Sequence, residues 1–131
     1  YIPAMDAMIT ELVGLEAQIR SLATGINNNI DAVNYRMKRD MRPQCDALMN
    51  SLNGLKTRAS GMSPPPEFGS VHPQFSQLVG YCIERVNAFY AGISAVESGG
   101  DWEGAFKLGI APKDAYNALL PTFQAQYNSL K

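Results

Sequence analysis

Few side chains in this sequence have the chemistry of a reactive site. Histidine occurs once, at His72, and cysteine occurs twice, at Cys45 and Cys82. A nucleophilic serine or cysteine needs a base beside it, and no spacing in the sequence marks such a partner for His72. Because His72 stands just before Pro73, at the edge of a Pro-rich linker, we interpret it as a helix-start residue that hydrogen-bonds to the backbone of that linker. We therefore expect no catalytic residues; the alternative, an enzyme, would need Glu84 or His72 buried in a cleft.

The motifs that usually hold metal ions or haem do not occur in the sequence. There is no Cys-x-x-Cys and no His-Glu-x-x-His, and Gly69 stands where a Glu-x-x-His motif ending at His72 would need its glutamate. The six methionines offer thioethers that suit Cu(I), and Met37 and Met41 are one helical turn apart. Methionine at helical spacing is more often core filler. We predict no cofactor and no metal site, and we keep a metal in the bundle interior as an alternative.

Four apolar stripes with helical spacing indicate the elements that position these residues. Steps of three and four residues lead from Met5 to Ile26, from Val33 to Ala59 and from Phe75 to Val96. A last stripe, with members seven residues apart, leads from Trp102 to Leu130. No run of alternating β-branched residues predicts a strand.

Turn and cap residues separate the stripes. The breaks are Thr24-Gly25 with Asn27-Asn28-Asn29, Gly61 with Ser63-Pro64-Pro65-Pro66, and Ser98-Gly99-Gly100, after which Asp101 is the expected N-cap of the last helix. Within the stripes, Pro43 predicts a kink or a helix start, Pro112 a kink or a restart, and Pro121 a bend. The sequence therefore predicts an all-α single domain over residues 1–131. We expect an antiparallel up-down four-helix bundle with a Pro-rich linker between its second and third helices.

The two cysteines fall on the apolar faces of the second and third predicted helices. These helices flank the Pro-rich segment from Met62 to Pro73, so we expect them to be antiparallel neighbours. At 1.5 Å per residue, Cys45 lies ~24 Å and Cys82 ~17 Å from that segment, a mismatch of about one turn. A bridge is within reach, so we predict a Cys45–Cys82 disulfide that adds ~4 kcal/mol in the chain-entropy model. Two free thiols in the core are the alternative.

Length and charge limit the classes of function. A chain of 131 residues is about one domain, and 46% hydrophobic with 18% charged residues is typical of a folded core. The net charge of -1 provides no footprint for nucleic acid. No apolar run approaches the ~20 residues of a membrane span. Since the chain begins at Tyr1 and not at Met, we interpret it as processed, with an export signal or lipid anchor removed from its N-terminal side.

The order of linker and cap residues is similar to a recurring bacterial pattern. Ser63-Pro64-Pro65-Pro66-Glu67-Phe68 is followed by His72, Phe75 and a long Ala-containing helix that ends in Glu97-Ser98-Gly99-Gly100-Asp101. Over about residues 40 to 130 the chain resembles the small helical-bundle domains of uncharacterised exported proteins and lipoproteins. The resemblance implies a bundle outside the cytoplasm, secreted or anchored at the bacterial cell envelope, and supplies no activity to transfer.

These observations favour a non-catalytic module for protein interaction or ligand sensing at the cell envelope. His72, Tyr81, Tyr90 and Trp102 are the candidate residues for a ligand or partner surface, because tyrosines beside an apolar stripe can line a groove. The alternative is a binding protein for a small apolar ligand or metal in the bundle interior. The expected partners are a protein or a small ligand and no nucleic acid, with a homodimer and tethering to a membrane through the removed segment as further alternatives.

Overall fold

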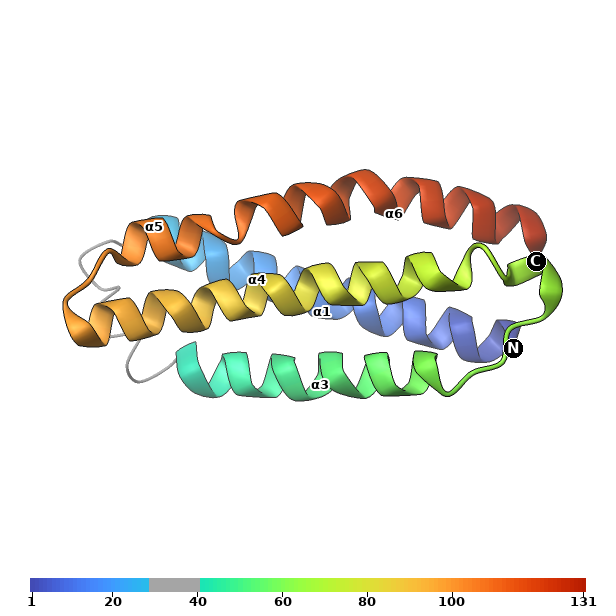
Figure 1. Ribbon diagram of the computed structural model, residues 1–131, viewed down its shortest axis with the longest axis horizontal. Coiled ribbons are helices and arrows are strands. Elements are labelled where there is room, and N and C mark those ends of the chain that lie inside the picture. Colours follow the sequence, from blue (N-terminus) through green and yellow to red (C-terminus); the bar gives the residue numbers. More distant parts are fainter. Residues whose placement is uncertain (29–40) are drawn as a thin grey trace.

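The computed structural model describes residues 1–28 and 41–131, and every regular element in those two ranges is helical, which confirms the predicted all-α class. Four long helices form a helical bundle, seen from the side in Figure 1. They are α1 (Ile2–Asn28), α3 (Arg42–Ser60), α4 (His72–Ser98) and α6 (Ile110–Leu130). Two short helices, η2 (Pro66–Phe68) and α5 (Trp102–Lys107), precede α4 and α6. Val33 and Met37 of the second predicted stripe lie outside the described residues.

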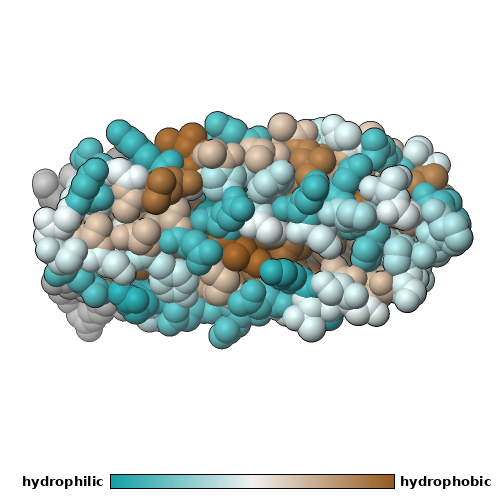
Figure 2. Space-filling view, viewed as in Figure 1, coloured by the Kyte–Doolittle hydropathy of each residue, from teal (hydrophilic) through white to brown (hydrophobic). Residues whose placement is uncertain are grey.

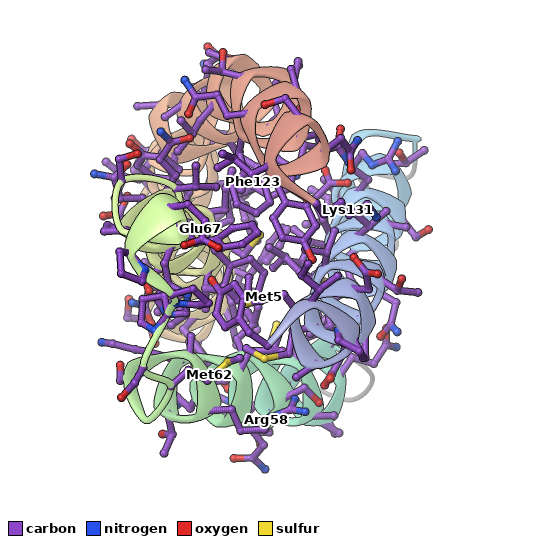
Figure 3. The ribbon with its side chains drawn as sticks, turned by 90° about the vertical axis from the view of Figure 1, so that its right-hand side faces the viewer. Met5, Arg58, Met62, Glu67, Phe123 and Lys131 are labelled. Carbon is purple, nitrogen blue, oxygen red and sulfur yellow. The ribbon has the colours of Figure 1, made fainter. Side chains whose placement is uncertain are left out.

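The predicted apolar stripes form the buried faces of the long helices. Looking along the bundle in Figure 3, Met5 of α1 and Phe123 of α6 lie between the helices, whereas Arg58 of α3 lies on the outside. The fourth stripe ends earlier than predicted: Tyr127 is buried, but Leu130, at the last turn of α6, is 39% exposed. The buried stripe residues are Met5, Met8, Leu12, Leu15, Ile19 and Ile26; Met41, Cys45, Leu48, Leu52, Leu55 and Ala59; Phe75, Val79, Cys82, Val86, Phe89 and Ile93; and Tyr116, Phe123 and Tyr127.

Helix α4 is the central element of the bundle. It packs against α1, α3, α5 and α6. Side chains on several sides of α4 are therefore buried, including the charged residue Arg85. A charge in this position needs a partner, because an unpaired buried charge is strongly unfavourable.

One end of the bundle brings together the starts of α1 and α4 and the ends of α3 and α6. The Nε2–H of His72 donates to the backbone oxygen of Ala59 at 2.8 Å, so its Nδ1 is left to accept from the Tyr1 hydroxyl at 2.6 Å. The prediction that His72 starts a helix is confirmed, whereas the predicted bond to linker backbone is wrong, because the acceptor Ala59 lies in α3. The Tyr127 hydroxyl of α6 lies 2.8 Å from the carboxylate of Asp6 in α1 and donates to it. Figure 1 accordingly shows the two chain termini at the same end.

Prolines and a left-handed glycine set the helix boundaries. Pro43 and Pro112 lie in the first turns of α3 and α6, where the missing N–H leaves no helical bond unmade, so the predicted start and restart are confirmed. Pro121 lies inside α6, which continues through it. Gly99 has φ 75° at the end of α4, a left-handed conformation that glycine adopts without a steric penalty. In the described residues, no helix is both long and apolar enough to cross a membrane.

Candidate ligand-binding cleft

A cleft of about 350 Å³ lies where α5 and the start of α6 face α4 and the C-terminal part of α1. Three aromatic rings line it. Phe89 of α4 and Phe106 of α5 have centroids 6.1 Å apart, and Trp102 meets Phe106 edge-on at 6.2 Å. Ile26 of α1 and Ile110 of α6 add aliphatic surface. These walls suit an apolar ligand, since most of the area they offer is hydrocarbon.

The turn between α4 and α5 directs the chain back across the cleft. Gly99 is left-handed and the Gly100 N–H donates to the Ala95 oxygen at 2.7 Å, which completes a Schellman motif. One residue later the Asp101 carboxylate accepts from the Gly104 N–H at 3.0 Å and caps α5, as predicted. The two caps together place Trp102 and Phe106 over α4.

Two glycines allow the chain around α5 to approach α4 closely. A Cβ atom added at Gly92 of α4 would lie 2.4 Å from the ring of Phe106, so the ring rests on the bare backbone of α4. A Cβ added at Gly109, between α5 and α6, would lie 3.3 Å from the Cβ of Ala88. The shape of the cleft therefore depends on the absence of a side chain at both positions.

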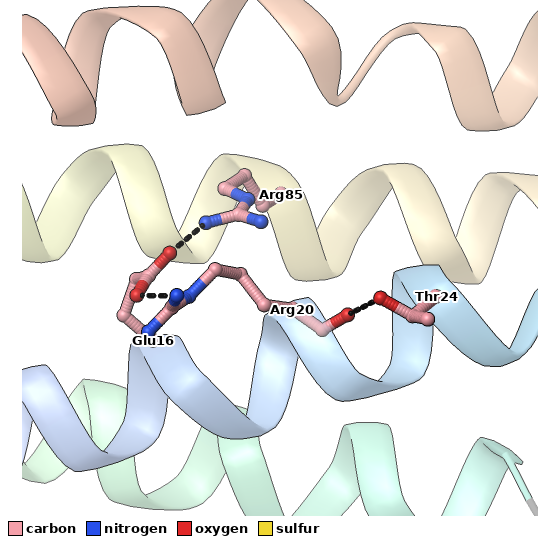
Figure 4. A network of polar contacts seen from close by, with 4 residues as sticks. All are labelled: Glu16, Arg20, Thr24 and Arg85. Atoms are coloured by element: carbon pink, nitrogen blue, oxygen red, sulfur yellow. Dashed lines mark hydrogen bonds and ion pairs between the residues drawn. The ribbon is translucent and has the colours of Figure 1, made fainter.

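Of the described residues that line the cleft, Arg85 is the one that is both charged and buried. Its Nη1 donates to Glu16 Oε1 of α1 at 3.0 Å, and Arg20 Nε donates to the second oxygen of Glu16 at 2.8 Å (Figure 4). The side chains of Arg85 and Glu16 are 4% and 6% exposed, whereas that of Arg20 is 62% exposed. The cleft thus has a guanidinium at its inner side that is paired with a carboxylate from a neighbouring helix.

The rim of the cleft is charged. Lys107 of α5 and Lys113 of α6 line it and are exposed, as is Glu103 of α5. With Arg85, the lining carries three positive charges and one negative charge, in a chain whose net charge is -1. The described lining of the cleft therefore has a net positive charge.

The groups behind Arg85 are polar but are held in their neutral forms. Burial raises the pKa of Cys82 to about 12, with Glu16 adding to the shift and Arg85 opposing it. Burial also raises the pKa of Tyr116. Cys82 and Glu16 add to this shift, whereas Arg85 and Arg20 oppose it. The Tyr116 hydroxyl is buried and has no hydrogen-bond partner among the described residues.

Of the four surface residues predicted from the sequence, only Trp102 lines the cleft. His72 lies at the far end of α4, bonded to Tyr1 and Ala59. Tyr81 and Tyr90 are nine residues apart on one helix, which places them on opposite sides of it and ~13 Å apart along its axis. Tyr90 donates to Asp46 of α3, and burial together with this bond raises its pKa. The structure therefore does not bring these four residues together on one surface.

The predicted disulfide is not present. Cys45 and Cys82 are both buried free thiols, which corresponds to the alternative stated from the sequence. Burial raises the pKa of Cys45 to about 11, as it does that of Cys82 to about 12. The distances expected from the sequence, ~24 Å and ~17 Å, differ by ~7 Å along the helices, which already equals the limit on the Cα separation of a disulfide.

The ion pair in the core was not predicted, although a signal for it exists in the sequence. Arg85 follows Cys82 by three residues and precedes Phe89 by four, so it lies on the apolar stripe of α4. Glu16 similarly stands four residues after Leu12. When each of two helices carries a charged residue on its apolar stripe and the two charges have opposite sign, the pattern indicates a buried ion pair.

The described residues also lack a group of three or more His, Cys, Asp and Glu side chains placed to hold a metal ion. Glu84, which an enzyme would need in a cleft, is exposed, and it does not line this one. Comparisons with models of known protein families, with curated proteins and with solved structures found no match to this chain.

Proposed function

We propose that the protein is a non-catalytic binding module that takes a small, largely apolar ligand into the cleft between α1, α4, α5 and α6. The observation that carries this proposal is the cleft itself, about 350 Å³ with aromatic walls and one buried guanidinium. At roughly 30 Å³ per non-hydrogen atom, it accepts a ligand of about twelve such atoms. Sites of this kind, apolar with a few polar groups, are common between the helices of bundles.

The proposed scaffold is an up-down bundle whose neighbouring helices run antiparallel, with the Pro-rich segment connecting α3 to α4. Two contacts support this arrangement. At one end His72, which begins α4, bonds to Ala59 near the end of α3. At the other end Arg42, which begins α3, pairs with Glu97 near the end of α4 at 2.6 Å.

Binding is favoured over catalysis by the groups that line the cleft. Its ionisable side chains are Arg85, Glu103, Lys107 and Lys113, a set with no histidine or cysteine and a single carboxylate. Among the described lining residues there is no serine, cysteine or histidine that could form a nucleophile–base pair of the common kind. The location outside the cytoplasm stays a prediction from the sequence resemblance, and the free cysteines give it no support.

Trp102 allows a direct test, because it is the only tryptophan of the chain and lines the cleft. We expect 1-decanol, an apolar molecule of suitable size, to change the emission of Trp102 in a saturable way. An Ala23→Leu variant, which places three more carbons in the cleft, should abolish the change. The matched control is Ala7→Leu, on an exposed position of the same helix. No saturable response in the folded wild-type protein would reject the proposal.

A protein partner, including a second copy of this chain, is the second candidate. Leu108 and Ile110, at the junction of α5 and α6, are 66% and 48% exposed. Figure 2 shows hydrophobic atoms on this part of the surface, beside hydrophilic ones. Sedimentation velocity tests the dimer. Self-association that Leu108→Glu abolishes would support it. A protein that stays monomeric at about 100 µM, a concentration on the order of the Kd of a weak dimer, would reject it.

A further inference from the structure

We propose that the ligand of the cleft is an amphipathic organic anion, a monocarboxylate on an apolar body, whose carboxylate is bound by Arg85. This inference rests on the proposed function, because it assigns a chemical class to the ligand of the same cleft. It is carried by three features: an unused hydrogen-bonding edge on a buried guanidinium, the sign of the charge around the cleft, and the size of its apolar part.

The first feature is the geometry of the Arg85 guanidinium. Among the described residues, its one hydrogen bond runs from Nη1 to Glu16. The remaining edge of a guanidinium, formed by Nε and Nη2, presents two parallel N–H groups, which match the two oxygens of a carboxylate. Figure 4 shows the second terminal nitrogen of Arg85 directed away from Glu16, on the side where Thr24 lies. The neighbouring α1 residues Ala23 and Ile26 line the cleft, so this edge faces the ligand space.

The unused edge distinguishes a carboxylate from a neutral ligand. Arg85 as a whole is 3% exposed, but its Nε and Nη2 are not among the fully buried atoms that lack a partner, so this edge keeps contact with the solvent of the cleft. An alkane or alcohol in the cleft would displace water from these N–H groups without replacing both hydrogen bonds. A carboxylate replaces both with charge-assisted bonds.

The second feature is charge. Glu16 carries one negative charge and is shared by the buried Arg85 and the largely exposed Arg20, so the three side chains together have one positive charge in excess. Lys107 and Lys113 add positive charge at the rim. The field over the cleft therefore attracts an anion and repels a cation.

The third feature restricts the anion to a small amphipathic one. The rings of Phe89, Trp102 and Phe106 line the cleft and provide the apolar surface on which the body of the ligand would pack. About twelve non-hydrogen atoms fit in the volume. Decanoate, with ten carbons and two oxygens, has this size, whereas a nucleotide is both larger and charged at several positions.

The test compares three ligands that differ only at the head: decanoate, 1-decanol and decylamine, titrated against the folded protein at neutral pH with Trp102 emission and NMR shifts as readouts. We expect decanoate to bind about tenfold or more tightly than decanol, as a charge-assisted bidentate pair implies. Decylamine should bind most weakly. Equal affinity for decanoate and decanol would overturn the anion inference and leave the proposed function standing. Binding of none of the three would overturn both.

A double variant assigns the preference to Arg85. Glu16→Gln with Arg85→Gln removes both buried charges together, so neither is left unpaired. The preference for decanoate over decanol should disappear, and a saturable response of Trp102 emission to decanol would still report an intact cleft. The matched control is Glu11→Gln with Arg58→Gln, which removes an ion pair of 2.6 Å between α1 and α3 that does not line the cleft. If the Glu16/Arg85 variant kept its preference for decanoate, the rim lysines would hold the anion and the role of Arg85 would be wrong.

Discussion

The buried residues Glu16 and Arg85 should be coupled in their contribution to the free energy of unfolding, and a double-mutant cycle can measure this coupling. We choose Glu16→Met and Arg85→Met, because methionine is unbranched and has a similar length. Both native side chains are more than nine-tenths buried, so each single change leaves a buried charge with its main partner removed. A broken buried ion pair typically costs about 3–5 kcal/mol. In the Arg85→Met variant, Arg20 can still pair with Glu16. Because Arg20 is 62% exposed, this pair offsets only a small part of the lost stability.

The double variant should lose far less than the sum of the two single variants. With both charges gone, two methionines fill the site with hydrocarbon, and such replacements of buried pairs are often close to neutral. With single losses of about 3–5 kcal/mol each and a double variant close to neutral, we expect a coupling energy of about 6 kcal/mol or more. For a chain of 131 residues, a loss of about 3–5 kcal/mol in a single variant corresponds to a fall in Tm of roughly 10–18 °C.

The assay is urea unfolding followed by circular dichroism at neutral pH, with thermal unfolding as a second measurement. Arg58→Met is the control, since Arg58 pairs with Glu11 on the surface and both side chains are more than one third exposed. That change should stay within about 0.5 kcal/mol. The reasoning would be refuted if Arg85→Met cost less than about 1 kcal/mol, or if the two single effects simply added in the double variant.

Three further predictions follow from the buried groups and from the end of α4. Tyr116→Phe should stabilise the fold by about 1 kcal/mol in urea unfolding, because it removes a buried hydroxyl without a partner among the described residues; a loss of stability would show that the hydroxyl is bonded. The pKa of Cys45 is raised to about 11 and that of Cys82 to about 12, from a usual value of 9.0, so the unfolded chain ionises first. Stability should be complete below that usual value and should fall as pH rises toward 12, by up to about 1.4 kcal/mol per pH unit for each thiol; a flat profile would contradict the burial. Without reductant, both thiols should react with iodoacetamide only after denaturation, and a chain that stays unlabelled then would reinstate the disulfide. Gly99→Ala should cost about 1–2 kcal/mol because alanine is strained at φ 75°, and an unchanged midpoint would argue against the left-handed turn.

Much of the fold could be predicted from local patterns. The spacing of Met5 to Ile26 and of Phe75 to Ile93 identified both the helices and the faces that they bury. The caps were equally local: Asp101 begins α5, as its position before Trp102 indicates. These features are readable because helical periodicity and capping depend on residues within a few positions of each other.

The candidate site was less predictable. Trp102 was identified, but Tyr81 and Tyr90 lie on opposite sides of α4, and His72 serves the packing of the helix ends. A periodic stripe does not state how two helices are rotated and shifted relative to each other, and each residue of shift moves a side chain by 1.5 Å and about 100°. The same uncertainty led to the wrong disulfide.

Short-range order along the chain is sufficient to predict that it is helical, where its long helices carry their apolar faces, and which residues cap the turn before α5. The contact of Glu16 with Arg85 across 69 positions, the separation of the two cysteines and the packing of Phe106 on Gly92 become visible once the helices are placed in space. The physical reason is that pairing and cavities arise from the packing of helices against one another. Packing selects one relative rotation and shift from many that the same apolar stripes would accept.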